Sequence, residues 1–174
     1  MQAQRAHGVV RIAVKYGLLQ GVLSFVIFLF GTLGAVRHNR VVAVANTTLL
    51  IVLMVLAHWE FKRNHAGRMT YAQGLGTGTL LSSAAAVISC VLMYVYVRYI
   101  NSGYLAAVMQ AQRAALERRG ITGAQAQLAI GITAAITTPV GIAVTSLITG
   151  VLEGFIVALI VSIFTQKADP EVVV

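Results

Sequence analysis

The sequence has few of the residues that shape soluble or disulfide-bonded proteins. Among its 174 residues it has one cysteine and two prolines, and only 10% of its residues are charged. The lone Cys90 excludes an intrachain disulfide, and it excludes zinc sites that take two or four thiolates from one chain. Soluble domains carry charge on about a quarter of their residues. This chain therefore has too little charge to cover the surface of an ordinary soluble domain.

Long apolar runs take the place of the missing charge. Apolar residues make up 58% of the chain, and the mean hydropathy is +0.83. A membrane-spanning helix needs about 20 mostly apolar residues, and four runs meet this length: 16–36, 41–59, 72–96 and 139–164. Lipid cannot satisfy free backbone N–H and C=O groups, so each run is predicted to be a helix. The sequence predicts an all-α integral membrane protein with one four-helix domain over residues 1–174.

The segment between the third and fourth runs, residues 101–138, is the only sizeable polar part of the chain. Its apolar residues recur near helical spacing, at Leu105, Val108, Met109 and Leu116. Gly120 is predicted to end a first helix, and Thr122 with Gln125 fits a capping box that begins a second. Pro139 then marks a kink or a fresh helix start. We expect an extramembrane helical hairpin here.

The basic surplus of the chain indicates a membrane partner. Thirteen Lys and Arg residues outweigh five acidic ones, giving a net charge of +8. Most of the basic residues flank the predicted spans, where they orient helices and attract anionic headgroups. No basic stripe with interleaved aromatic residues is present to stack bases, so the predicted partner is the lipid bilayer and not nucleic acid.

An even number of spans places both termini on one side of the membrane. That side carries seven basic residues in the sequence, and the other side carries six. Basic residues close to the spans favour the cytoplasm, and two of the six, Arg118 and Arg119, are distant from the third span. The sequence therefore predicts a multi-pass protein of the bacterial cytoplasmic (inner) membrane with both termini in the cytoplasm.

Three glycine pairs with a spacing of four residues form the most repeated motif. The pairs are Gly17 and Gly21, Gly74 and Gly78, and Gly150 and Gly154. Each pair places two small residues on one helix face, where backbones can approach closely in lipid. We interpret these faces as helix-packing surfaces within one bundle, with a dimer seam as the alternative. An accessory or scaffolding subunit would pack through such faces in a homo-oligomer or a larger membrane complex.

Glu153 is the only ionisable residue inside the fourth apolar run. A charged carboxylate at the bilayer centre costs at least about 2.5 kcal/mol, so we expect this side chain to be protonated, to face the bundle interior, or both. One interpretation is a neutral acid hydrogen-bonded to Asn46, Thr47 or Thr48. The other is the ion-binding residue of a small proton- or cation-linked transporter or channel.

The sequence predicts no cofactor, no metal and no enzyme. His58, Glu60 and His65 are the only weak metal candidates, and their spacing matches no standard site. The chain has neither a G-x-S-x-G nucleophile elbow nor an H-E-x-x-H motif, and we assign no catalytic residue. The favoured hypothesis is a non-enzymatic accessory or scaffolding protein, with a Glu153-dependent transporter or channel as the alternative.

Four stretches resemble a family of small bacterial four-span membrane proteins of unknown function (domain of unknown function forty-one ninety-nine). They are KYGL at 15–18, GRMTYAQGL at 67–75, YVYVRYI at 94–100 and GVLEGFIVALIVSIF at 150–164. The resemblance implies four spans and an acid in the fourth span shortly before a proline. Glu153 matches that acid, while Ile156 stands at the place of the proline. The resemblance implies an architecture and supplies no reaction.

Overall fold

A computed structural model describes residues 2–32 and 39–167, and these residues are almost entirely helical. The elements are α1 (Gln2–Thr32), α2 (Asn39–Asn64), α3 (Tyr71–Val95), the π-helix η1 (Tyr96–Ile100), α4 (Tyr104–Arg118), α5 (Gly123–Ile136) and α6 (Pro139–Thr165). Four helical segments are long and apolar enough to cross a membrane: Gly8–Thr32, Arg40–Asn64, Tyr71–Ile100 and Pro139–Thr165. The predicted all-helical class and the four spans are confirmed.

The helices extend beyond several of the predicted spans. Helix α1 begins well before residue 16, and α2 continues to Asn64, beyond the predicted end of the second span at residue 59. Lys62 and Arg63 lie in the last turn of α2, where cations stabilise the negative end of the helix dipole. The third span extends to Ile100 through η1. The predicted end of the first span, 33–36, lies outside the described residues.

The fourth span begins as a fresh helix at Pro139, the second of the two possibilities that the sequence left open. The backbone N–H of Gly141 donates to Thr138 Oγ1 at 2.9 Å, so Thr138 caps the helix and proline occupies its first position. Helix α5, which precedes this start, has 14 residues and is too short to span a bilayer.

The structure has a capping box before α3, and the box predicted before α5 is absent. Thr122 precedes α5 but makes no side-chain capping bond, so that predicted box is wrong; the next residue, Gly123, has a φ of 66°. At α3, the backbone N–H of Gln73 donates to Thr70 Oγ1 at 3.3 Å, and the backbone N–H of Thr70 donates to Gln73 Oε1 at 2.9 Å. This reciprocal pair begins the third span.

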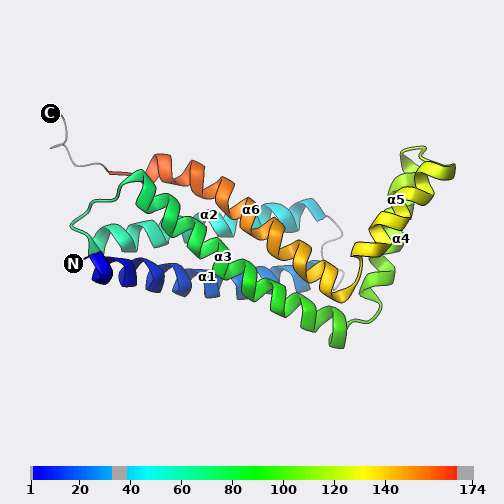
Figure 1. The fold of residues 1–174 in the computed structure, drawn as a ribbon, viewed down its shortest axis with the longest axis horizontal. Coiled ribbons are helices and arrows are strands. Elements are labelled where there is room, and N and C mark those ends of the chain that lie inside the picture. Colours follow the sequence, from blue (N-terminus) through cyan, green and yellow to red (C-terminus); the bar gives the residue numbers. More distant parts are fainter. Residues whose placement is uncertain (1, 33–38, 168–174) are drawn as a thin grey trace. The chain divides into compact units, whose positions relative to one another are not determined.

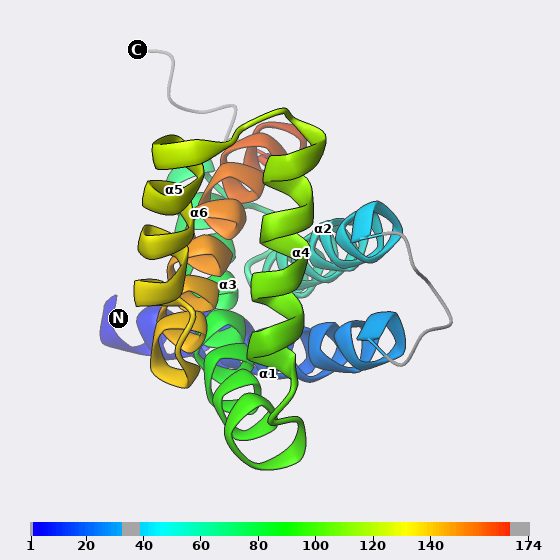
Figure 2. The ribbon, with the colours of Figure 1, turned by 90° about the vertical axis from the view of Figure 1, so that its right-hand side faces the viewer.

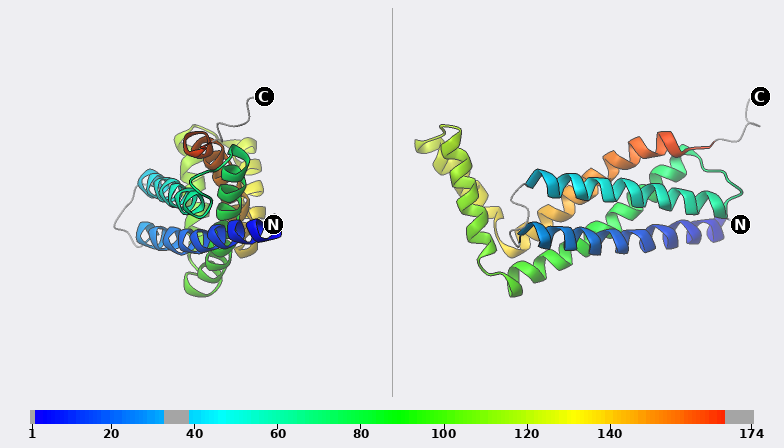
Figure 3. Two further views of the ribbon diagram at one scale, coloured as in Figure 1. Left: turned by 90° about the vertical axis from the view of Figure 1, so that its left-hand side faces the viewer. Right: turned by 180° about the vertical axis from the view of Figure 1, so that it is seen from behind.

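The chain divides into two compact units, Met1–Ser89 with Leu147–Val174, and Cys90–Ser146. In the first unit α1 and α2 pack side by side in opposite directions (Figures 1 and 3). All four long helices contribute to its buried core, which includes Ala13, Met54, Phe61, Leu81 and Ala158. The prediction of a single membrane domain over 1–174 stays a prediction.

The second unit contains η1, α4 and α5, and Figure 2 shows α4 beside α5. Asn101 Nδ2 donates to the Tyr96 hydroxyl at 2.9 Å, and the Tyr96 and Tyr104 rings meet edge to face at 5.9 Å. Burial raises the pKa of the Tyr104 phenol above its ordinary value, and the nearby Tyr96 raises it further. Tyr104 is therefore a neutral phenol at physiological pH.

The outward faces of the long helices carry large apolar side chains. Exposed examples occur on every one of the four candidate spans and include Val22, Val44, Val91, Leu152 and Phe164. An apolar exterior of this extent is unfavourable in water. It is the surface that a helical protein presents to hydrocarbon, in agreement with contact between these helices and a lipid bilayer.

Candidate functional site

Polar contacts gather where four helix ends meet in the first unit. The start of α1, the end of α2, the start of α3 and the end of α6 lie together (Figure 1). We call this region, residues 8–16, 58–75 and 161–167, the terminal end. All three weak metal candidates lie within it, as do the cations Lys62, Arg63, Arg68 and Lys167.

His58 is completely buried and joins three helices at the terminal end. Its Nδ1 lies 2.7 Å from Thr165 Oγ1, and its Nε2 lies 3.0 Å from the carbonyl oxygen of Gly74. A carbonyl only accepts, so Nε2 carries a hydrogen and donates it to Gly74. In the neutral ring Nδ1 is an acceptor, and it shares the single hydrogen of the Thr165 hydroxyl with the Val161 carbonyl oxygen, which lies 2.8 Å from Thr165 Oγ1. His58 thus connects α2 to both α3 and α6.

Glu60 connects α2 to α1. Lys15 Nζ and the Tyr16 hydroxyl both donate to Glu60 Oε2, at 2.7 and 2.8 Å. The lysine is 61% exposed and the glutamate 31%, so water weakens their ion pair. Tyr16, which is partly buried, adds a second bond to the same oxygen. The α1–α2 contact therefore has a polar tie beside its apolar packing.

The three weak metal candidates are not brought together. His65, in the turn after α2, stacks on the Phe61 ring with centroids 4.0 Å apart, and its Nδ1 lies 2.9 Å from the Phe61 carbonyl oxygen. His58 and Glu60 contact other partners. Within residues 2–32 and 39–167, no group of three or more His, Cys, Asp or Glu side chains is placed to hold a metal ion.

Glu153 lies one residue past the midpoint of α6 and is half-buried. The Thr47 hydroxyl donates to Glu153 Oε1 at 2.6 Å, which joins α6 to α2. Thr47 is one of the three partners that the sequence suggested, whereas Thr48 is exposed. Beside Thr47 on α2, Asn46 Oδ1 is buried without a hydrogen-bond partner. Polar oxygen atoms of α2 and α6 thus lie in the interior of the first unit.

The first glycine pair packs α1 against α3. A Cβ atom added at Gly17 would lie 2.6 Å from the Leu81 carbonyl oxygen, and one added at Gly21 would lie 2.8 Å from Ile88 Cβ. Both distances are shorter than real Cβ contacts. The backbones of the two helices approach closely only because these positions lack side chains.

The other two pairs pack α3 against α6. An added Cβ would lie 3.0 Å from Ser162 Oγ at Gly74, 2.8 Å from Ala158 Cβ at Gly78, and 3.1 Å from Ala86 Cβ at Gly150, and at Gly154 it would overlap Ser82. All six glycines therefore face other helices of the same chain.

Two contacts of the first unit were missed from the sequence. Gly31 lies against α2, because an added Cβ would be 2.6 Å from Val42 Cγ2. This glycine has no partner four residues away, so the pair motif did not reveal it. Met69 and Lys167 form an isolated antiparallel bridge through two backbone hydrogen bonds of 3.2 and 2.8 Å. Backbone pairing of this kind leaves no side-chain pattern.

Four apolar helices joined by close glycine contacts and a few interior hydrogen bonds define a multi-pass helical membrane protein. The family model described as "Protein of unknown function (DUF4199)" matches residues 15–167. The chain belongs to this family, and the resemblance that its sequence motifs indicated is confirmed. Neither a curated protein nor a solved structure matches the chain.

Proposed function

We propose that the chain is a non-enzymatic accessory or scaffolding subunit of a membrane assembly. The observation that carries the proposal is that all six paired glycines pack within the chain, so a partner would meet the apolar outer surface of the bundle and not the glycine faces that the sequence suggested. A bundle whose glycine faces pack against its own helices is folded before it meets a partner, so it can join a complex as a rigid unit. The polar side chains of the spans that hydrogen-bond between helices, among them His58 and Thr47, serve the same closure.

The proposed setting is a bacterial cytoplasmic membrane with both termini in the cytoplasm. Basic residues at the terminal end, including Lys62, Arg63 and Lys167, support this orientation, because cations beside spans favour the cytoplasmic side. The polar helix α4 and the short apolar helix α5 then form an extramembrane hairpin on the other side. Contacts between these two helices, and their joining turn at Gly120 with a φ of 69°, support the hairpin.

A measurement of mass in native lipid tests the accessory role. The full chain is released from its membrane in polymer-bounded lipid discs, and the protein mass of each particle is measured. We expect a mass greater than one chain, from further copies or from a companion in fixed ratio. The Gly76→Ala variant, which alters an exposed glycine with open space around it, should give the same mass. Particles that always hold a single chain would refute the role.

The contact between Glu153 and Thr47 favours a second candidate, a proton- or cation-linked transporter or channel. Cations bind to carboxylate, hydroxyl and amide oxygens, and the described spans provide all three types on α2 and α6, with Asn46 Oδ1 unpartnered. An acid within a transmembrane helix is a recognised feature of ion pathways.

Ion flux in reconstituted vesicles tests this second candidate. Glu153→Gln removes the ionisable group and keeps an oxygen that can accept from Thr47, so it should abolish flux while leaving the protein folded. Glu117→Gln makes the same chemical change at an exposed position of α4 and should leave flux unchanged. The absence of ion flux in vesicles with the unaltered chain would exclude the candidate. Equal flux in the Glu153→Gln and Glu117→Gln variants would exclude it as well.

A further inference from the structure

A cationic pocket lies on the surface of the terminal end. It is open to solvent, has a volume of about 360 Å³, and is lined by Trp59, Lys62, Arg63, Gly67 and Lys167. Three of these five residues are cations and none is acidic. A concave surface with this charge attracts a compact anion, because the field of several like charges adds within a hollow.

The fold holds these cations in place. The Met69–Lys167 bridge fixes the backbone of Lys167 beside the turn that follows α2. Gly67, with a φ of 78° and open space around its missing side chain, shapes the same turn. Lys62 Nζ donates to the Thr165 carbonyl oxygen at 3.3 Å and has two further hydrogens for a ligand.

The nearest acid along α2 does not neutralise the pocket. Glu60 accepts from both Lys15 and Tyr16 on the α1 side of the helix. Its charge is therefore satisfied away from Lys62 and Arg63. Among the described residues, no acidic side chain lines the pocket, so the positive charge of its lining residues is not neutralised there.

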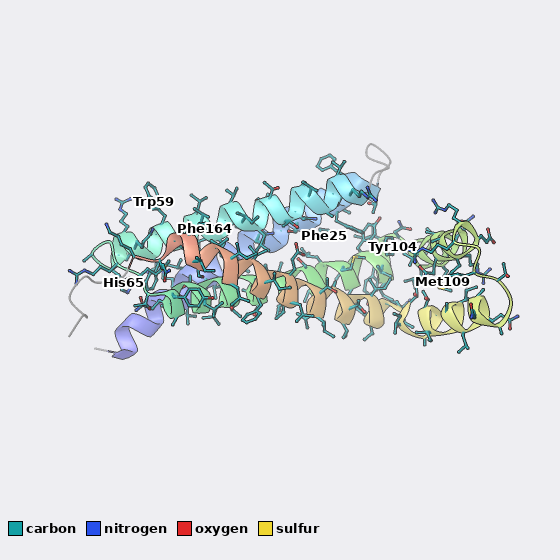
Figure 4. The ribbon with its side chains drawn as sticks, turned by 90° about the horizontal axis from the view of Figure 1, so that it is seen from above. Phe25, Trp59, His65, Tyr104, Met109 and Phe164 are labelled. Carbon is teal, nitrogen blue, oxygen red and sulfur yellow. The ribbon has the colours of Figure 1, made fainter. Side chains whose placement is uncertain are left out.

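Trp59 places the pocket at the depth of the lipid headgroups. Its side chain is 70% exposed and projects from the outside of α2, near the end that also carries His65 (Figure 4). Tryptophan is enriched at the boundary between hydrocarbon and water. The exposed apolar residues Val52, Val55 and Leu56 continue from Trp59 along α2. An acyl chain can follow this apolar surface while the headgroup occupies the pocket.

We propose that this pocket binds the phosphate of an anionic phospholipid headgroup. Cations beside a span attract anionic lipid, and here the charge is paired with an interfacial aromatic ring and an adjoining apolar surface. The inference does not depend on the accessory role, because a transporter could hold the same lipid.

Trp59 is the only tryptophan of the chain, so its fluorescence reports directly on the pocket. The full chain is reconstituted in phosphatidylcholine vesicles that contain a fixed fraction of brominated phosphatidylglycerol or brominated phosphatidylcholine. Each cation near the surface favours anionic lipid by about fivefold. We therefore expect the brominated anionic lipid to quench Trp59 with an apparent affinity about tenfold higher or more.

Matched triple variants separate this site from general charge attraction. Lys62→Gln, Arg63→Gln and Lys167→Gln together should remove the preference for anionic lipid. Arg113→Gln, Arg118→Gln and Arg119→Gln remove the same charge from the α4 region and should preserve it. The double variant Arg63→Gln with Lys167→Gln keeps the Lys62 bond to Thr165. It should lose most of the preference for anionic lipid. If the triple variant fails to fold, the double variant still tests the proposal.

Inorganic phosphate distinguishes the lipid from a soluble anion. At a concentration equal to that of the anionic lipid, phosphate should leave the quenching unchanged. Displacement of the brominated lipid by phosphate would overturn the proposal and assign the pocket to a soluble ligand. Equal quenching by the two brominated lipids, or a preference that survives both pocket variants, would overturn it as well.

Discussion

Gly154→Ala should lower the unfolding free energy of the bundle by about 3 kcal/mol, since overpacking of a tight contact costs about 1–3 kcal/mol or more. The added methyl group would overlap Ser82 Cβ and Oγ on α3. Ser82 is buried and its hydroxyl donates to the Gly78 carbonyl oxygen at 2.9 Å. It cannot move aside without disturbing α3, so the two helices must separate. The loss of unfolding free energy is measured by reversible unfolding in bicelles, driven either by a steric trap or by added detergent.

Two glycines on α3 provide a graded control for this prediction. Gly78→Ala should be destabilising but less so, because its methyl group would meet Ala158 at 2.8 Å and the flexible Met54 side chain at 3.0 Å. Gly76, two residues away, has nothing within 4 Å of an added Cβ, and Gly76→Ala should not destabilise the bundle but stabilise it by up to about 1 kcal/mol, because alanine favours a helix more than glycine does. If Gly154→Ala kept full stability and altered only the number of chains per particle, the glycines would form a dimer seam instead.

His58→Leu should destabilise the bundle by about 2–4 kcal/mol, through two lost hydrogen bonds and a reshaped buried site. The leucine fills much of the volume of the ring but leaves the Gly74 carbonyl and the Thr165 hydroxyl without their α2 partner. The same unfolding assay measures the loss. A double-mutant cycle with Thr165→Val then isolates the α2–α6 bond, because the single losses should not add when the two groups interact.

His65→Leu is the matched control for His58. Among the described contacts, its ring meets only Phe61 of the preceding helix α2, by stacking and through the Phe61 carbonyl oxygen. We expect a loss of less than about 1 kcal/mol, as for other partly exposed residues. A larger loss of stability for His65→Leu than for His58→Leu would mean that the hydrogen bonds of His58 to α3 and α6 do not hold the terminal end together.

Hydrophobic patterning was sufficient to predict the class of fold. Hydrocarbon imposes a length and a composition on each span, and both can be read directly from the chain. Helix ends were predicted less well: the residues after Trp59 are charged but remain helical to Asn64, because a helix can leave the membrane without ending. The capping signature was misleading at Thr122, whereas Thr70, which also precedes a glutamine by three residues, forms a capping box that was not predicted.

The interior contacts show the same limit of local patterns. The chemistry of a lone acid in a span indicated that Glu153 needs a partner on another helix, and the structure places Thr47 there. The partners of His58 could not be predicted, since Gly74 and Thr165 are distant in sequence and one of them contributes only a carbonyl oxygen. Likewise, a glycine pair identifies a small face of a helix but does not identify the helix that covers it.

The bridge between Met69 and Lys167 has a consequence for how the sequence can vary. Main-chain atoms make both of its hydrogen bonds, so the bridge itself does not depend on which side chain occupies the exposed position of Lys167. Proline is the exception, because it has no N–H to donate. Homologous chains can therefore diverge at Lys167 and still align their last helix in the same way, whereas Met69 is fully buried in the core and is constrained by packing as well.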